Sequence, residues 1–409
     1  MLRYFRNRHI EGEVVVHCTD GLRRTSVVLM ALLVMESILS TGCLRVKEAL
    51  TKLRKCRPGM VSNQEDFNLA LEIADELLHG AATAWGADEF KGNLSKTSSL
   101  LFRKAHVLES VSVSEAVQRP AFLDMHRFPS IIPLDTRRVV LQSEDQIDDE
   151  GDKEEHDRKS LKDENQDSRE DKRLPSNSYI NAVWVDSYDR RFGFVVTEHP
   201  LAEMRERFWR LVVQNRCQNV VFCNDYTKVD QEFPNILPGE GGEMNFGKYL
   251  VQVLAVQAPA KHIIKYQVNI TLCQLRDAPL MVSVYKITGW PYGQELPESS
   301  RVVGDVAELL CESFSAPDRG PSLLCCGDGV TASGLLAGAV CVVQRLRDSR
   351  EVDIYRTVVK LKRCRHEFIT SSKQFEFLYF VAARYIDATM IYEGEQEGDL
   401  RGKSLTEKR

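Results

Sequence analysis

The stretch "VVVHCTDGLRRTS", residues 14–26, decides how this chain folds and what it could do. Its three valines predict a short strand, and the apolar run that follows predicts a helix, so a strand-to-helix turn lies between them. Cys18 opens that turn, and Arg24 stands six residues after it. The backbone N–H groups of such a turn and the helix dipole favour a thiolate and an oxyanion at the same place. The stretch therefore predicts a nucleophilic cysteine beside an anion site.

The other residues of the turn fit the same chemistry. Gly21 lets the backbone turn tightly enough to aim its amides inward. The planar guanidinium of Arg24 can bind two phosphate oxygens, and the hydroxyl of Thr25 can donate to the sulfur when it becomes a leaving group. Together they have the chemistry for a phosphocysteine intermediate. The expected phosphate cradle consists of Thr19, Asp20, Gly21, Leu22, Arg23 and Arg24.

A second copy of this unit follows at an offset of 308 residues, where Cys18 falls on Cys326. Both copies predict a strand, a turn, an apolar helix, a second helix that ends near a Cys-Arg pair, and a third helix. Several strand-like segments, such as "NAVWVDSY", precede the second copy. The first copy has only sixteen residues before His17, so it resembles the last part of a domain. Other identities at this offset are Asp20 and Asp328, Gly21 and Gly329, Lys52 and Lys360, Leu53 and Leu361, Cys56 and Cys364, Arg57 and Arg365, and Phe67 and Phe375.

The pattern HCxxGxxR(S/T) resembles the active-site signature of the protein tyrosine phosphatases. The resemblance implies an α/β (α+β) fold, in which helices flank a twisted mixed sheet, and hydrolysis of phosphotyrosine in proteins without a metal or cofactor. It makes Cys18 the nucleophile, and His17 would tune its sulfur. Further segments resemble the family in its own order: "RKCRPGMVSNQEDF" (54–67), "MHRFPSIIPLDTRRVVL" (125–141), "NSYINAVWVDSY" (177–188), "VVTEHPL" (195–201), "FWRLV" (208–212) and "GWPY" (289–292).

The resemblance to the tandem cytoplasmic region of receptor-type enzymes gives the expected division of the chain. Residues 1–82 would be the C-terminal part of a first phosphatase domain, 83–115 a linker, 116–390 a complete second domain, and 391–409 a polar tail. Residues 143–173 contain 14 acidic and 7 basic side chains. Such a segment cannot bury enough apolar surface to fold, so we expect a disordered insert there.

The second copy departs from the family's pattern at its reactive positions. It keeps Cys326, but Ala332 stands where the family has its arginine. Tyr292 replaces the acid of the family's Trp-Pro-Asp segment, and Phe128 replaces the tyrosine that stacks on the substrate ring. Gln374 matches the glutamine that helps to position the hydrolytic water. These departures indicate that the second domain is a pseudophosphatase.

The first copy has the opposite pattern, because its cysteine loop is intact but no acid loop precedes it. We interpret it as a truncated or incomplete domain, or as a fragment that takes its missing half from a partner. The leading hypothesis is the C-terminal tandem region of a receptor-type protein tyrosine phosphatase with an inactive second domain. The alternatives are a non-catalytic regulatory module and a rhodanese-like sulfur carrier, and the YINA and Trp-Pro segments argue against the carrier.

The bulk composition narrows the choice of partners and compartment. The formal charge of −5 gives no indication of nucleic-acid binding, and eleven irregularly spaced cysteines fit a reducing cytosol. The longest apolar run, residues 26–35, is too short to span a bilayer, and residues 1–12 lack the apolar h-region that a signal peptide needs. We expect a cytoplasmic protein, or the cytoplasmic region of a single-pass receptor. Its expected partners are a phosphotyrosine protein and an intramolecular contact between the two domains.

Overall fold

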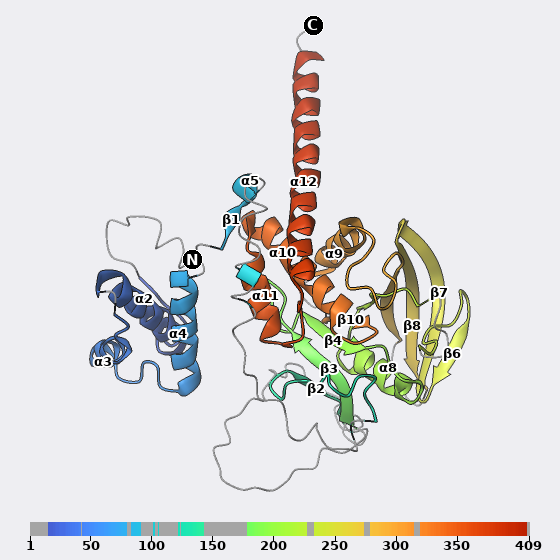
Figure 1. The fold of residues 1–409 in the computed structure, drawn as a ribbon, viewed down its shortest axis with the longest axis horizontal. Helices are drawn as coiled ribbons and strands as arrows, with labels where there is room; N and C mark the ends of the chain where they lie inside the picture. The colour runs from blue at the N-terminus through green and yellow to red at the C-terminus, as the bar shows by residue number, and fades with distance from the viewer. Residues whose placement is uncertain are drawn as a thin grey trace. The chain divides into compact units, whose positions relative to one another are not determined.

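The computed structural model forms two compact units, Met1–Trp85 and Gly86–Arg409 (Figure 1). It describes residues 15–41, 43–79, 83–90, 101–102, 105, 122, 124–142, 178–226, 233–273, 279–314 and 320–406. The acidic segment 143–173, where we expect disorder, lies outside the described residues, as does most of the expected linker.

In the described part of the first unit, three helices surround a small apolar core. They are α2 (Arg23–Thr41), α3 (Val46–Cys56) and α4 (Gln64–His79), as the sequence predicts. Helix α3 is amphipathic and buries Ala49 and Leu53. Helix α4 follows Asn63, whose side-chain oxygen accepts the backbone N–H of Asp66 at 2.7 Å, a typical N-terminal cap. The buried core of the unit consists of Val27, Met30, Ala31, Val34, Ala49, Leu53, Met60, Val61, Ala70 and Ala74.

The strand predicted before Cys18 is not formed at Val15 and Val16, so that prediction is wrong for these residues. Val15 is 85% exposed. A strand needs neighbours that pair with its backbone N–H and C=O groups, and a valine-rich sequence cannot supply them. The equivalent strand of the second unit, Ser322–Cys326, has two such neighbours.

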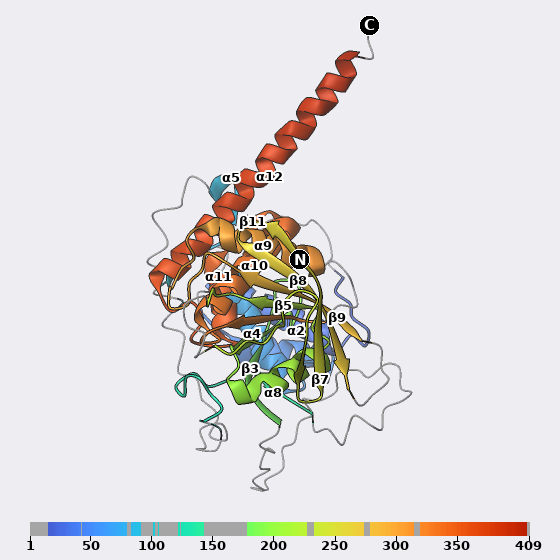
Figure 2. The same ribbon diagram turned by 90° about the vertical axis from the view of Figure 1, so that its right-hand side faces the viewer.

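A nine-stranded mixed sheet forms the centre of the second unit (Figure 2). Its order is β2-β3-β4-β10-β5-β9-β8-β7-β6. Strand β10 pairs in parallel with β4 on one side and β5 on the other, and β9 is parallel to β5. The remaining pairs are antiparallel. The strands are β2 (Arg138–Val140), β3 (Tyr179–Val185), β4 (Phe194–Glu198), β5 (Asn219–Phe222), β6 (Glu243–Phe246), β7 (Tyr249–Ala260), β8 (Ile263–Leu272), β9 (Leu280–Ile287) and β10 (Ser322–Cys326).

Helices flank this sheet, which confirms the predicted fold class. Helix α8 (Arg205–Gln214), after the short helix η4 (Ala202–Met204), packs against β6 and β7. Helix α10 (Thr331–Ser349) follows the β10 strand and packs against α9 (Ser300–Phe314), α11 (Ile354–Lys362) and α12 (Ser372–Thr406) (Figure 1). Helix α12 therefore continues into the segment expected to be a polar tail. The remaining short elements are β1 (Trp85–Gly86), α5 (Ala87–Phe90) and β11 (Glu351–Val352), and β1 pairs with β11.

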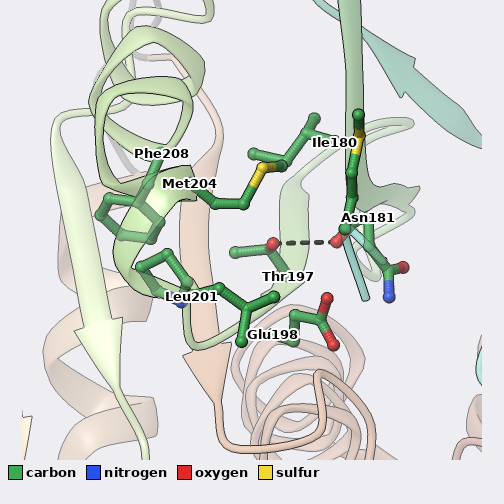
Figure 3. Close-up of a pocket in the computed structure, with 9 residues that line it drawn as sticks. Ile180, Asn181, Thr197, Glu198, Leu201, Met204 and Phe208 are labelled. Carbon is green, nitrogen blue, oxygen red and sulfur yellow. Dashed lines mark hydrogen bonds between the residues drawn. The ribbon is translucent and has the colours of Figure 1, made fainter. Parts of the chain in front are cut away.

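The end of β4 carries a buried acid beside a small pocket. Figure 3 shows Thr197 and Glu198 at this pocket with Asn181, whose carbonyl accepts the Thr197 hydroxyl at 2.9 Å. Glu198 is 5% exposed, and both of its carboxylate oxygens accept the backbone N–H of Arg127 at 3.2 Å. Burial raises the pKa of Glu198 from 4.5 to about 7, although that hydrogen bond opposes the shift.

The raised pKa predicts how the Glu198→Gln substitution changes stability with pH. The folded state binds this proton more tightly than the unfolded state, so the carboxyl stabilises the fold below pH 4.5 and loses that contribution as the pH rises through about 7. A neutral glutamine avoids the loss, so the variant should be more stable than the parent at pH 8 by about 2 kcal/mol. Chemical unfolding at pH 5 and pH 8 measures the difference, with the exposed Glu203→Gln as control. An equal effect at both pH values would contradict the prediction.

Candidate functional site

An arginine, Arg57, donates a hydrogen bond to the backbone of the first cysteine loop. Gly21 has a φ of +67°, in the left-handed region that favours glycine. Its carbonyl accepts a hydrogen bond from Nη1 of Arg57 at 3.4 Å. A Cβ at Gly21 would lie 2.6 Å from the same nitrogen, so a larger residue would displace the Arg57 guanidinium, and the backbone conformation itself favours glycine. Arg57 caps the end of α3, which fixes the loop to the helical part of the unit.

The second cysteine loop has the same geometry 308 residues later. Gly329 has a φ of +70°, and its carbonyl accepts Nη1 of Arg365 at 3.3 Å. Val61 and Ile369, which share the same offset, both have a φ of +52° although neither is glycine. The two cysteine loops therefore follow the same backbone path on the same support.

The side chains around Cys18 favour its thiolate. The hydroxyl and the backbone N–H of Thr25 lower the pKa of this half-buried thiol, although the hydroxyl forms no hydrogen bond with the described residues, whereas the hydrogen bond from the thiol to Asp20 acts in the opposite direction. Thr25 itself is buried at the first turn of α2. The structure thus brings together Cys18, Asp20 and Thr25. Of the other predicted residues, Leu22 and Gly21 are half-buried, and His17, Thr19, Arg23 and Arg24 are exposed.

Cys326 has the opposite electrostatics, although its loop has the same shape. It is fully buried at the end of β10. Burial, together with the charge of Asp328, raises the pKa of its thiol from 9.0 to about 12, and a contact of 3.1 Å with Ser333 Oγ does not offset this. Ser333 stands at the position of Thr25. At neutral pH the thiol of Cys326 is therefore protonated and a poor nucleophile.

Tyr292 lies directly over the second cysteine loop. A Cβ at Gly327 would overlap its ring, so the phenol occupies the space above the loop. The same ring packs edge-on against Phe233 at 4.6 Å, and Phe233 stacks on Tyr226 at 4.3 Å. Ala332 is buried at the start of α10 and offers no hydrogen-bond donor to a phosphate. From the sequence, we predicted only that an acid is missing at position 292. The structure adds that the ring of Tyr292 covers the loop at Gly327, and we call this ring the aromatic cover.

The two remaining predicted residues of the second site have structural contacts. Phe128 is half-buried, and its carbonyl accepts the N–H of Ile131 at 3.0 Å. Gln374 is buried, and its side-chain amide donates to the carbonyl of Thr331, the first residue of α10, at 3.2 Å. Gln374 therefore anchors the helix that follows the cysteine loop.

From the sequence, Asp328, Arg57 and Arg365 received no role, and Asp20 was assigned only to the expected phosphate cradle. Asp20 and Asp328 accept hydrogen bonds within their own loops, and Arg57 and Arg365 support those loops. All four are among the identities at the offset of 308 residues. The repeat therefore marked these four positions, but their hydrogen bonds are visible only in the folded loops.

The comparison with known proteins agrees with this geometry. The model of the protein-tyrosine phosphatase family matches residues 1–76 and 122–384, so the chain belongs to that family. It is 21% identical to receptor-type tyrosine-protein phosphatase U of Gallus gallus over 392 residues, which is 92% of this chain and 25% of that protein. It is 22% identical to receptor-type tyrosine-protein phosphatase epsilon of Rattus norvegicus over 398 residues, 92% of this chain and 52% of that protein. The chain thus spans between a quarter and about half of these relatives.

Within the part of the chain that the structure describes, no helix combines the length and the apolar character that a membrane crossing requires. Over the same residues, no three His, Cys, Asp or Glu side chains come together as a metal site would require.

The contrast between the two thiols predicts their reactivity. Iodoacetamide at neutral pH should alkylate Cys18 faster than the exposed Cys43 and Cys56, and Cys326 should react only after unfolding. The Thr25→Val substitution removes the hydroxyl that lowers the pKa of Cys18 and should slow the alkylation of Cys18 roughly three- to tenfold. Mass spectrometry of tryptic peptides measures each rate. The matched Ser333→Ala substitution should leave the rate at Cys18 unchanged, and equal rates at all four cysteines would refute the prediction.

Proposed function

We propose that this chain comprises the nucleophile-bearing C-terminal part of one protein-tyrosine-phosphatase domain and a complete second domain without activity. One observation supports this proposal above all: two loops with the same backbone have opposite side-chain chemistry. Cys18 has a lowered pKa and an arginine, Arg24, in its loop, whereas Cys326 has a pKa of about 12 and Ala332 at the arginine position. The first loop suits nucleophilic catalysis, and the second does not.

The proposed reaction proceeds through a phosphocysteine. The Cys18 thiolate attacks phosphorus, so that an S–P bond forms while the P–O bond to the aryl group breaks and the phenolate leaves. Arg24 and the loop amides stabilise the charge on the phosphoryl oxygens. Water then attacks the phosphocysteine and releases inorganic phosphate. The hydroxyl of Thr25 stabilises the departing thiolate, and His17, the exposed residue before Cys18, has the sulfur-tuning role that the family resemblance implies.

The natural substrate in this proposal is a phosphotyrosine side chain of another protein. Because the chain is similar to receptor-type phosphatases and spans only part of them, we place it in the cytoplasmic region of a receptor. A second candidate function is a non-catalytic regulatory module. The aromatic cover of Tyr292 over Gly327 favours this function for the second unit, which would act through contact with the first.

The first test compares the two cysteines in the whole chain. Hydrolysis of p-nitrophenyl phosphate should be lost in Cys18→Ser and unchanged in the matched Cys326→Ser. This substrate has a good leaving group and depends little on a general acid. A phosphotyrosine peptide should be hydrolysed far more slowly, because general acid catalysis is worth about 10²–10⁴-fold. Activity that survives Cys18→Ser, or disappears in Cys326→Ser, would contradict the proposal.

The second test restores the second site. In a Cys18→Ser chain, Ala332→Arg should restore phosphate binding and Tyr292→Asp should both remove the aromatic cover and supply an acid. The two substitutions together should therefore raise the hydrolysis of p-nitrophenyl phosphate more than either substitution alone. The same double variant with Cys326→Ser is the control. Activity in the unrestored Cys18→Ser chain would show that the second unit is not a pseudophosphatase.

A further inference from the structure

The exposed carboxylate of Asp20 caps backbone amides of the first cysteine loop. Oδ1 of Asp20 accepts the backbone N–H of Leu22 at 2.9 Å and that of Arg23 at 3.2 Å. The same oxygen accepts the thiol of Cys18 at 3.2 Å. This one oxygen thus accepts hydrogen bonds from two amides of the expected phosphate cradle and from the thiol of Cys18.

The second loop repeats the arrangement with an independent set of atoms. Oδ1 of Asp328 accepts the N–H groups of Val330 and Thr331, each at 2.9 Å, and the thiol of Cys326 at 3.1 Å. The hydroxyl of Thr331 donates to its other oxygen. The contact is therefore a property of the loop conformation and of an aspartate two residues after the cysteine.

We propose that Asp20 is an internal occupant of the anion cradle that restrains the Cys18 site. The inference rests on the proposed function, because it assigns a specificity-determining residue to the same site. A phosphate must displace the carboxylate from the amides of Leu22 and Arg23 before it can bind to them. It must also approach a fixed negative charge of its own sign.

The same carboxylate acts on the nucleophile. A thiol that donates to a carboxylate is held in its protonated form, so Asp20 opposes the effect of Thr25 on Cys18. The hydrogen bonds from Leu22, Cys18 and Arg23 lower the pKa of Asp20 to about 2, so its side chain is ionised at neutral pH. An ionised carboxylate has no proton to give, and Asp20 cannot replace the general acid of the family.

Cations near the carboxylate keep the site attractive for anions. Arg23 and Arg24 lie in the loop, and Arg57 donates to the carbonyl of Gly21 below it. Asp20 therefore lowers the affinity of a positively charged loop without abolishing it. The loop should bind oxyanions weakly in the parent chain and more tightly when the carboxylate is neutralised.

The test neutralises Asp20 and keeps its shape. In Asp20→Asn the amide oxygen can still accept the backbone N–H groups, while the charge is gone. In the full chain, the inorganic phosphate concentration that half-protects Cys18 from iodoacetamide should fall about tenfold, as expected for the removal of one unit charge near a bound dianion. Without phosphate, the alkylation of Cys18 should become faster. Because the effect is electrostatic, it should shrink in about 1 M sodium chloride, where the Debye length is about 3 Å.

Two further variants control for effects outside the Cys18 loop and for poor folding of Asp20→Asn. Asp328→Asn in the second loop should leave both measurements at Cys18 unchanged. Asp20→Ser removes the charge and keeps a residue that caps helices well, so it should reproduce the gain if Asp20→Asn folds poorly.

The outcomes separate this inference from the proposed function. If phosphate protects the parent and both Asp20 variants equally, or protects the variants less well, Asp20 does not restrain the site and the inference is wrong, while the proposed function stands. If phosphate protects none of the chains, and Cys18 reacts no faster than Cys43, the proposed function fails, and the inference fails with it.

Discussion

A guanidinium that donates to a glycine carbonyl is the interaction on which both cysteine loops depend. Arg365 is fully buried in the second unit, where it bonds to the carbonyl of Gly329 at 3.3 Å and to Oδ1 of Asn181 at 2.8 Å. A buried charge requires such partners, because an unpaired one would cost several kcal/mol. The arginine thus ties the end of α11 to strand β3 and to the loop after β10. Arg57 repeats its contact with the first loop.

The two loops show that backbone shape alone does not determine reactivity. The positive φ of the glycine, the support of the arginine and the aspartate inside the loop are common to both. The two loops differ in how deeply their cysteine is buried and in a few side chains around it. Cys326 at the end of a central strand is removed from solvent, and its thiol is held protonated, whereas Cys18 remains accessible beside a buried threonine. The same turn can therefore hold an accessible cysteine with a lowered thiol pKa in one place and a buried, protonated cysteine in the other.

Much of the fold could be predicted from the sequence, because the relevant signals are local. The apolar periodicity and the repeat predicted the three helices after each cysteine, and the alternating and apolar segments predicted the sheet of the second unit. The strand at Val15 and Val16 was predicted wrongly because strand formation depends on neighbours far away in the chain. The positions of Tyr292 over Gly327 and of Asp20 among the loop amides depend on tertiary packing and on hydrogen bonds, so residue types alone could not reveal them.

A crystal structure of the chain soaked with tungstate tests the central claim, that two equivalent loops differ in their capacity for a phosphate-like anion. Tungstate should bind in the Cys18 loop, with its oxygens on the loop amides and the guanidinium of Arg24, and with the carboxylate of Asp20 turned away. The Cys326 loop should remain covered by Tyr292 and hold no anion. Tungstate in both loops, or in the second alone, would contradict this account.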